Sequence, residues 1–350
     1  MARLFVRRKC MRRYTPLLLT AFVAAFLAVL GTVYLGTFAD KKGLQPGKTI
    51  TVYTTLPVEQ AEMLAQEYEK SANVRIAFKA MGTEELSSRL KKEANKSGAD
   101  LVLASRQVLE PAAAAGAFVP YGSEAADSVS DALKSEDDAW VGVWYDPIVF
   151  CVNSDYLALM TRIPSTWEEL AAYPGIRIGM TDFLAADAPQ QLMFTLAAEY
   201  GEPAAFRILA GLHPKVVQYV KYLSTPVRMA GMGEVDLSIA VQSETLRYIN
   251  QGYPLKIVYP SDGTAYLLTG MGLLNEKSPE ARAFMDWLLS DEAQLALQRE
   301  NQFYIPANQA TLAYKMLTGK NLILFEKQPE YTKEQRKAML DRWLKEVRFQ

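Results

Sequence analysis

The chain has 350 residues, of which half are hydrophobic, with two cysteines and one histidine. Six of its 38 basic residues lie among the first 13 positions, so the remainder has 32 basic and 39 acidic residues and a net charge of −7. We call this remainder, which follows the basic first 13 positions, the body of the chain. We do not expect so acidic a body to bind nucleic acid, because that binding depends on positive charge. Cys151 is the only cysteine after Cys10, so no disulfide is expected within the body. Its length and apolar content suit two lobes, each with its own hydrophobic core.

Residues 1–39 form a predicted signal peptide or membrane anchor. The basic start is followed by residues 14–39, which contain no charge, so the chain after Ala39 is expected on the far side of the membrane. The apolar run 17–35 has 19 residues and is long enough to span a bilayer. Thr37-Phe38-Ala39, however, is a tolerable cleavage site. The body is therefore expected to be periplasmic, either free after cleavage or tethered to the inner membrane.

Strands and helices alternate through the first part of the body. Short β-branched runs at 49–53, 74–80 and 100–105 are each followed by a segment with helical spacing of apolar residues. Such alternation predicts a parallel sheet with helices on both faces.

Two apolar runs, 140–145 and 148–153, are separated only by Asp146-Pro147 and predict one long extended crossing. Alternation then resumes over 176–241, and a second crossing is expected near 255–262. We therefore predict an α/β fold with two lobes, each with a central sheet flanked by helices. The first lobe comprises 48–145 plus 260–350, and the second comprises 146–259. The amphipathic segment 333–346 is expected to dock onto a lobe.

In parallel α/β sheets, ligands bind beyond the carboxyl ends of the strands, where helix N-termini present free N–H groups. The loops at those ends and at the crossings supply hydroxyl, amide, carboxylate and guanidinium groups. The candidate ligand-binding residues are Thr54, Thr55, Ser105, Arg106, Tyr145, Asp182, Asp187, Arg228, Gln242, Ser243, Asp262 and Thr264. The alternative interpretation is that the hydroxyls cap helices, the arginines are solvated and Tyr145 only limits the hinge.

Six segments follow one another across roughly residues 48–343. They are ITVYTT, GADLVLAS, GEVDLSIAV, EARAFMDWLLSDEAQLAL, YIPAN and RKAMLDRW. In order and spacing, they resemble the bacterial extracellular solute-binding proteins of ABC transporters. The resemblance is to the branch that contains binders of ferric iron, sugar phosphates, phosphoglycerate and aminoethylphosphonate.

This resemblance implies a periplasmic-binding-protein-like clamshell of type II that closes around its ligand. It also implies delivery of a small molecule to an ABC permease and ATPase. We expect a monomer without cofactor or metal. Phosphoglycerate-regulatory relatives suggest an alternative, a membrane-anchored sensor that reports its ligand to the histidine kinase of a two-component system.

The iron-binding residues of the family are not matched in this sequence. The ferric-iron members use a His after the first strand, a Glu after the third and a Tyr pair after the GEVD-like strand. The corresponding stretches are Leu56-Pro57, 104–106 and Gln242-Ser243-Glu244, in which only Glu244 could bind iron. We therefore expect a small organic anion, with phosphorylated molecules as the leading class and a ferric-iron binding protein as the alternative.

One part of the family's phosphate site also differs. Where relatives often have a Ser/Gly-rich phosphate loop, residues 181–189 contain Asp182 and Asp187 and no glycine. Carboxylates there suit ligand hydroxyls or an amine.

An enzyme is the rival class of function. His213 precedes Pro214 at a predicted helix end, where a cap is favoured over a general base. Cys151 lies within an apolar run, as a buried small hydrophobic residue would. The sequence contains no P-loop, GxSxG motif or metal-ligand cluster, so we expect no catalysis.

Overall fold

The computed structural model describes residues 48–349, except 94–97, 160–161 and 328–330. The predicted leader lies outside the described residues, and its cleavage or retention stays a prediction. Within the part of the chain that is described, no helix is long and apolar enough to cross a membrane. From Ile50 onward, apart from 73–75, the chain forms one compact unit, and the fold below is that of this unit.

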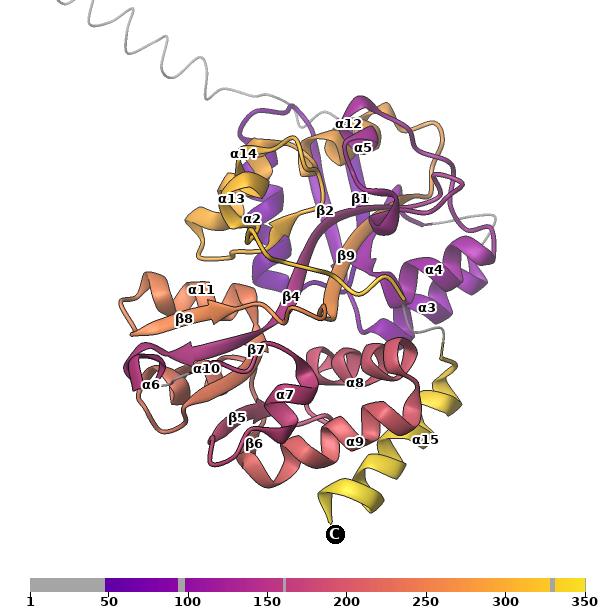
Figure 1. The fold of residues 1–350 in the computed structure, drawn as a ribbon. Coiled ribbons are helices and arrows are strands. Elements are labelled where there is room, and N and C mark those ends of the chain that lie inside the picture. The colour runs from indigo at the N-terminus through magenta and orange to yellow at the C-terminus, as the bar shows by residue number, and fades with distance from the viewer. Residues whose placement is uncertain (1–47, 94–97, 160–161, 328–330, 350) are drawn as a thin grey trace, which may run out of the picture. The chain divides into compact units, whose positions relative to one another are not determined.

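The first lobe begins with the expected alternation of strands and helices (Figure 1). Its elements are β1 (Thr49–Thr54), α2 (Val58–Glu69), β2 (Arg75–Ala80), α3 (Thr83–Lys92), β3 (Leu101–Ser105), α4 (Arg106–Ala114), α5 (Glu124–Asp127) and the 3-10 helix η1 (Asp131–Leu133). β1 and β3 are parallel, and residues 101–104 of β3 are fully buried.

The predicted crossing is a single strand, β4 (Val141–Asn153), whose 13 residues are all buried. Its first half, through Pro147, pairs with β9, whereas Ile148 and the residues after it pair with β7 and β8. Pro147 lacks an N–H donor, and it is accommodated where the strand changes from one set of partners to the other.

The second lobe follows with a further alternation of helices and strands. Its elements are α6 (Ser154–Leu159), α7 (Trp167–Ala172), β5 (Ile178–Thr181), α8 (Asp187–Tyr200), α9 (Glu202–Leu212), η2 (His213–Lys215), β6 (Val216–Val220), α10 (Ser224–Gly231), β7 (Leu237–Val241), α11 (Gln242–Asn250) and β8 (Leu255–Val258). β5 runs parallel to both β6 and β7.

The chain then returns to the first lobe and ends in the second. The remaining elements are β9 (Tyr266–Leu273), α12 (Pro279–Leu288), α13 (Asp291–Arg299), β10 (Ile305–Pro306), α14 (Leu312–Leu317), α15 (Lys333–Trp343) and the π-helical turn η3 (Leu344–Arg348). The second crossing lies later than predicted, because β8 still pairs with the far end of β4, whereas β9 pairs with β3 in the first lobe.

The strand order is β2-β1-β3-β9-β4-β7-β5-β6, and β8 and β10 also pair with β4. The predicted parallel pairing is observed between β1 and β3 and between β5 and its neighbours, whereas the strands that cross between the lobes pair antiparallel. β9 is antiparallel to β3 and β4, and β4 is antiparallel to β7. The reason is topological, because a strand that enters the second lobe and a strand that returns must run in opposite directions.

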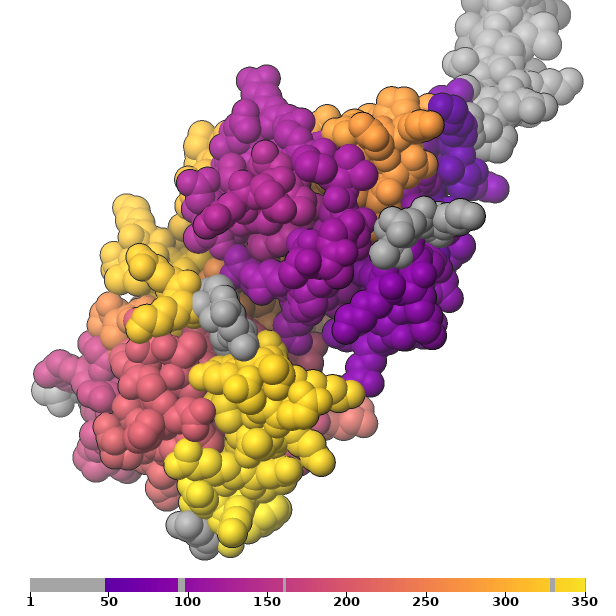
Figure 2. All heavy atoms as spheres, turned by 90° about the vertical axis from the view of Figure 1, so that its right-hand side faces the viewer, coloured from indigo at the N-terminus to yellow at the C-terminus, as the bar shows by residue number. Residues whose placement is uncertain are grey.

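The C-terminal helix packs into the core of the second lobe. Met339, Trp343 and Val347 are buried in the same cluster as Phe150 and Phe183, and both views show α15 along this lobe (Figures 1 and 2). The docking predicted for this segment is thus observed. The division of the chain into lobes at particular residues stays a prediction.

Candidate ligand-binding site

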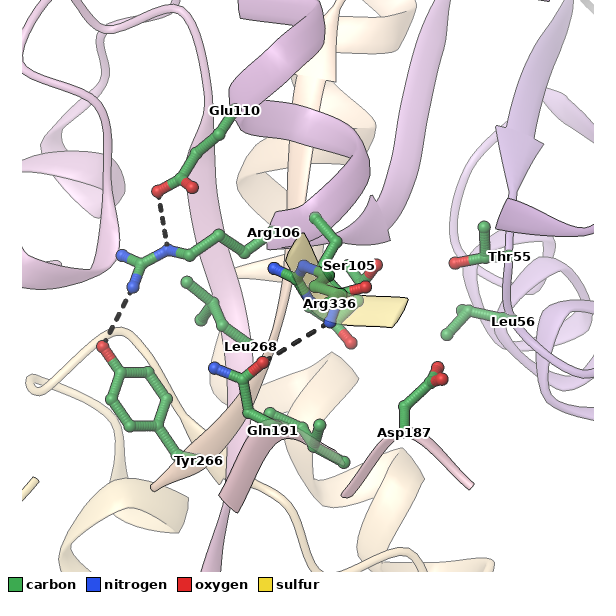
Figure 3. Close-up of a pocket in the computed structure, with 13 residues that line it drawn as sticks. Thr55, Leu56, Ser105, Arg106, Glu110, Asp187, Gln191, Tyr266, Leu268 and Arg336 are labelled. Atoms are coloured by element: carbon green, nitrogen blue, oxygen red, sulfur yellow. Dashed lines mark hydrogen bonds and ion pairs between the residues drawn. The ribbon is translucent and has the colours of Figure 1, made fainter. Parts of the chain in front are cut away.

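A cavity of about 210 Å³ opens between elements of the two lobes (Figure 3). The β1–α2 loop, the start of α4 and the start of β9 line it, together with α8 and α15. The lining residues are Thr55, Leu56, Ser105, Arg106, Gln107, Glu110, Asp187, Gln191, Tyr266, Leu267, Leu268, Thr269 and Arg336. Each contributing segment lies at a strand end or near a helix start.

Three helices begin at or near this cavity without a side-chain cap. The N-cap residues of α2, α4 and α8 are Pro57, Ser105 and Ala186, and none of them accepts a hydrogen bond from its helix. A serine or threonine caps α5, α7, α12, α13, α14 and α15, whereas α3, α9, α10 and α11 also have no side-chain cap. The interpretation of Ser105 as a side-chain cap is therefore wrong, and the first N–H groups of these three helices have no side-chain acceptor from the N-cap.

Arg106 forms part of the cavity wall with its charge already balanced. Its Nε lies 3.2 Å from Glu110 Oε1, and its Nη1 donates to the Tyr266 hydroxyl at 3.1 Å. Nη2 donates to the Ala132 carbonyl, and the guanidinium carbon lies 5.2 Å from the Trp140 ring centre. The side chain is only 12% exposed, so these partners fix its orientation.

Arg336 reaches the same cavity from α15. Its Nε donates to the Tyr331 carbonyl at 3.1 Å, and its guanidinium carbon lies 5.0 Å from the Phe194 ring centre. No acceptor for Nη1 or Nη2 is found among the described residues. Burial lowers the pKa of this guanidinium, and the charges of Asp187 and Glu110 oppose that effect. The group stays charged near neutral pH.

Four of the twelve predicted site residues line this cavity, namely Thr55, Ser105, Arg106 and Asp187. Asp187 lies in the first turn of α8, one helical turn before the buried Gln191. Gln191 Oε1 accepts a hydrogen bond from Gln107 Nε2 at 3.4 Å, which joins the two lobes beside the cavity.

Three other predicted residues are buried and hold the backbone together. Thr54 Oγ1 donates to the Leu103 carbonyl at 2.7 Å, and Thr264 Oγ1 donates to the Ile148 carbonyl at 2.5 Å. Gln242 Nε2 donates to the Leu317 carbonyl at 2.8 Å. These side chains lie outside the cavity, and contact with a ligand stays a prediction for them.

Three further predicted residues lie at or beside the two crossings between the lobes, where other protein groups contact them. Ser243 donates from its N–H and its hydroxyl to Asp146, at 2.9 and 2.5 Å. Asp262 accepts from the Tyr200 hydroxyl at 2.8 Å, and burial raises the pKa of its carboxyl. Tyr145 is 3% exposed and packs edge-on against Tyr266.

The remaining two predicted residues form ion pairs away from the cavity. Asp182 lies 3.6 Å from Arg348, and Arg228 lies 3.6 Å from Glu234.

Sequence reasoning missed several lining residues. Glu110 follows Arg106 and Gln191 follows Asp187 by four positions, so helical spacing could have indicated these two, whereas it gives no signal for Gln107, one position after Arg106. Arg336 carries no such signal, because its position depends on where α15 docks.

The two residues considered for catalysis, His213 and Cys151, are a helix cap and a buried side chain. His213 is the C-cap residue of α9, as predicted, and its Nδ1 lies 3.0 Å from the Tyr219 hydroxyl. Cys151 is fully buried, and burial raises the pKa of its thiol to about 11. A thiol with that pKa is a poor nucleophile at neutral pH.

Comparison with known proteins identifies the class. Residues 63–322 match the bacterial extracellular solute-binding protein family, and the chain belongs to this family. It is a periplasmic solute-binding protein of the ABC importer type, and such proteins deliver their ligand to a permease and an ATPase. An uncharacterized protein of Haemophilus influenzae is 27% identical over 348 residues, which cover 94% of this chain and 96% of that protein.

Solved structures of two-lobed binding proteins are similar in fold. The periplasmic binding protein AfuA of Actinobacillus pleuropneumoniae, with fructose-6-phosphate bound, is 24% identical with a TM-score of 0.66, covering 87% of this chain and 99% of AfuA. The periplasmic binding protein P5PA is 25% identical with a TM-score of 0.61, covering 86% and 100%. The ferric binding protein of Campylobacter jejuni is 19% identical with a TM-score of 0.67, covering 86% and 100%.

Proposed function

We propose that the cavity binds a small hydroxylated organic anion, with phosphate esters as the leading class, for delivery to an ABC permease and ATPase. The observation that carries this proposal is the convergence of three helix starts without side-chain caps on one cavity that Arg336 also lines. Backbone N–H groups at helix starts favour anions, and a guanidinium adds charge-assisted hydrogen bonds.

The other lining groups suit ligand hydroxyls. Asp187 and Glu110 supply carboxylate acceptors, while Gln107 and Gln191 supply amides. The volume of about 210 Å³ is below the roughly 300 to 1,000 Å³ of drug-sized sites, which favours a ligand of few atoms. A sugar monophosphate combines these features.

Long-range electrostatics do not favour an anion, because the body has a net charge of −7. Screening over about 8 Å at physiological salt confines that repulsion to short distances. Affinity must therefore come from the donors inside the cavity. The sensor alternative would use the same ligand site, and it stays a prediction.

Ferric iron is not our proposed ligand, although the fold is shared with ferric binding proteins. Hard ferric iron favours several anionic oxygen ligands. Glu244, which alone matches the family's iron set, is paired with Arg247. Leu56 lies where the iron-binding members have His.

The test is a thermal-shift panel on the purified full-length chain in mild detergent. The panel contains fructose 6-phosphate, phosphoglycerates, phosphonates, dicarboxylates, neutral sugars and ferric citrate. A ligand at 100 times its Kd stabilises by about 2.7 kcal/mol, which raises Tm on the order of 5 °C. We expect phosphate esters to give the largest shift. Stabilisation by neutral sugars alone, or a stoichiometric coloured ferric complex, would show that the proposal is wrong.

A further inference from the structure

The chain crosses between the lobes a third time, after α14. This strap, residues 318–327, pairs with the second crossing: Thr264 N–H donates to the Ile323 carbonyl, and Phe325 N–H donates to the Thr264 carbonyl, both at 2.9 Å. At its end, Lys327 Nζ donates to the Glu199 carbonyl near the end of α8. The strap therefore delivers the C-terminal helix to the second lobe (Figure 1).

α15 is fixed to that lobe by apolar contacts. Trp343 is 1% exposed, and its ring centre lies 4.6 Å from that of Phe183 and 5.6 Å from that of Tyr219. A capping box, formed by Thr332 and Gln335, fixes where the helix begins. Any movement of the second lobe therefore carries the first turn of α15 with it.

This docking brings Arg336 to the cavity opposite groups of the first lobe. Its ring contact with Phe194, on α8, orients the guanidinium from the side of the second lobe. Ser105 and the start of α4 line the cavity from the first lobe (Figure 3). Arg106 forms an ion pair with Glu110, whereas no ion pair of Arg336 is found among the described residues, although the charges of Asp187 and Glu110 also act on it.

We infer that Arg336 is the specificity-determining cation of the site, holding the anionic group of the ligand from the second lobe against the start of α4. The inference rests on the proposed function and names the residue that selects for charge. A guanidinium fork can donate two parallel hydrogen bonds to a phosphate or carboxylate. Its positive charge strengthens binding of an anion and not of a neutral analogue, so the affinity for the anion is higher. One anion held in this way would join both lobes, so selection for charge and closure would depend on the same contact.

The experiment compares two substitutions on one helix, Arg336→Gln and Arg342→Gln, in the full-length chain. Arg342 is a matched control, because it pairs with Glu346 and stacks 4.2 Å from the Phe206 ring centre, outside the cavity. The affinity for fructose 6-phosphate, or for the panel anion with the largest shift, is measured by calorimetry. We expect a loss of about 10- to 100-fold for Arg336→Gln, as for a charge-assisted hydrogen bond, and less than about 3-fold for Arg342→Gln.

Salt dependence separates a direct charge contact from a merely structural role. Wild-type affinity should fall between 0.05 and 0.5 M NaCl, and Arg336→Gln should flatten this dependence. Arg336→Lys should restore it while binding more weakly than wild type, because an ammonium lacks the planar fork.

If the wild-type chain binds no anion, the proposed function fails. If it binds anions and Arg336→Gln binds them equally well, or more weakly with an unchanged salt dependence, only the assignment of Arg336 fails.

Discussion

Asp146 is a buried carboxylate on the strand that joins the two lobes. It is 5% exposed and accepts two hydrogen bonds from Ser243 at the start of α11. Burial raises the pKa of this carboxyl to about 7, and the charge of Glu244 acts in the same direction. The hydrogen bonds from Ser243 oppose this shift without cancelling it.

A defined pH dependence follows, because the ordinary pKa of 3.8 applies in the unfolded chain. Between about pH 4 and 7 the native state binds the extra proton, so this group makes stability fall as pH rises. The effect is on the order of 2 to 4 kcal/mol across the window. Urea unfolding at pH 5 and pH 8 should show it for the wild type. Asp146→Asn should remove this component, and an equal pH dependence in both proteins would contradict the assignment.

At the scale of single residues, the sequence predicted which loops lie at the cavity better than it predicted which of their side chains line it. Thr55 and Ser105 were predicted from strand ends, and both line the cavity. Thr54 comes from the same reasoning, yet it is the last residue of β1 and is buried, with its hydroxyl on the Leu103 carbonyl, whereas Thr55 lies in the loop that follows. Ser243 was chosen as a free hydroxyl, but its partner Asp146 is 97 positions away, which no local pattern reveals.

At the scale of elements, periodicity identified the first strands and helices of the first lobe, because each apolar pattern is local, whereas β6, α6, α7 and α11 of the second lobe were not predicted. Pairing was less predictable. The long β4 was expected from two apolar runs, whereas its antiparallel pairing with β9 depends on residues more than 110 positions later. The composition of the sequence did not predict the strap or the packing of α15 against the second lobe.

The docking of α15 can be tested through Trp343. Its buried indole packs against Phe183 and Tyr219, so Trp343→Ala should lower the free energy of unfolding by about 3 to 5 kcal/mol. Phe349→Ala is the control, because that ring is 78% exposed and its loss should have little effect. Urea denaturation measures both variants. Similar stabilities would mean that α15 is not anchored as described.

At the scale of the whole molecule, the lobes are joined by β4, by the segment leading into β9 and by the strap. Two direct contacts between the lobes near the cavity are weak. Gln107 donates to Gln191 at 3.4 Å, and Lys333 forms an exposed ion pair with Glu84 at 2.5 Å. An exposed pair of this kind contributes about 0 to 1 kcal/mol. These contacts give little resistance to opening in the absence of a ligand.

Ligand binding should therefore change the distance between the lobes. An anion held by Arg336 on one side and by the start of α4 on the other adds contacts that exist only in the closed form, so it shifts the population toward closure. Small-angle scattering should give a smaller radius of gyration for the chain saturated with the anion that raises Tm most. A panel compound that leaves Tm unchanged should leave the radius unchanged, which controls for solvent effects. If the radius stays the same with the stabilising anion at saturation, the lobes do not close on the ligand and the site binds as a rigid pocket.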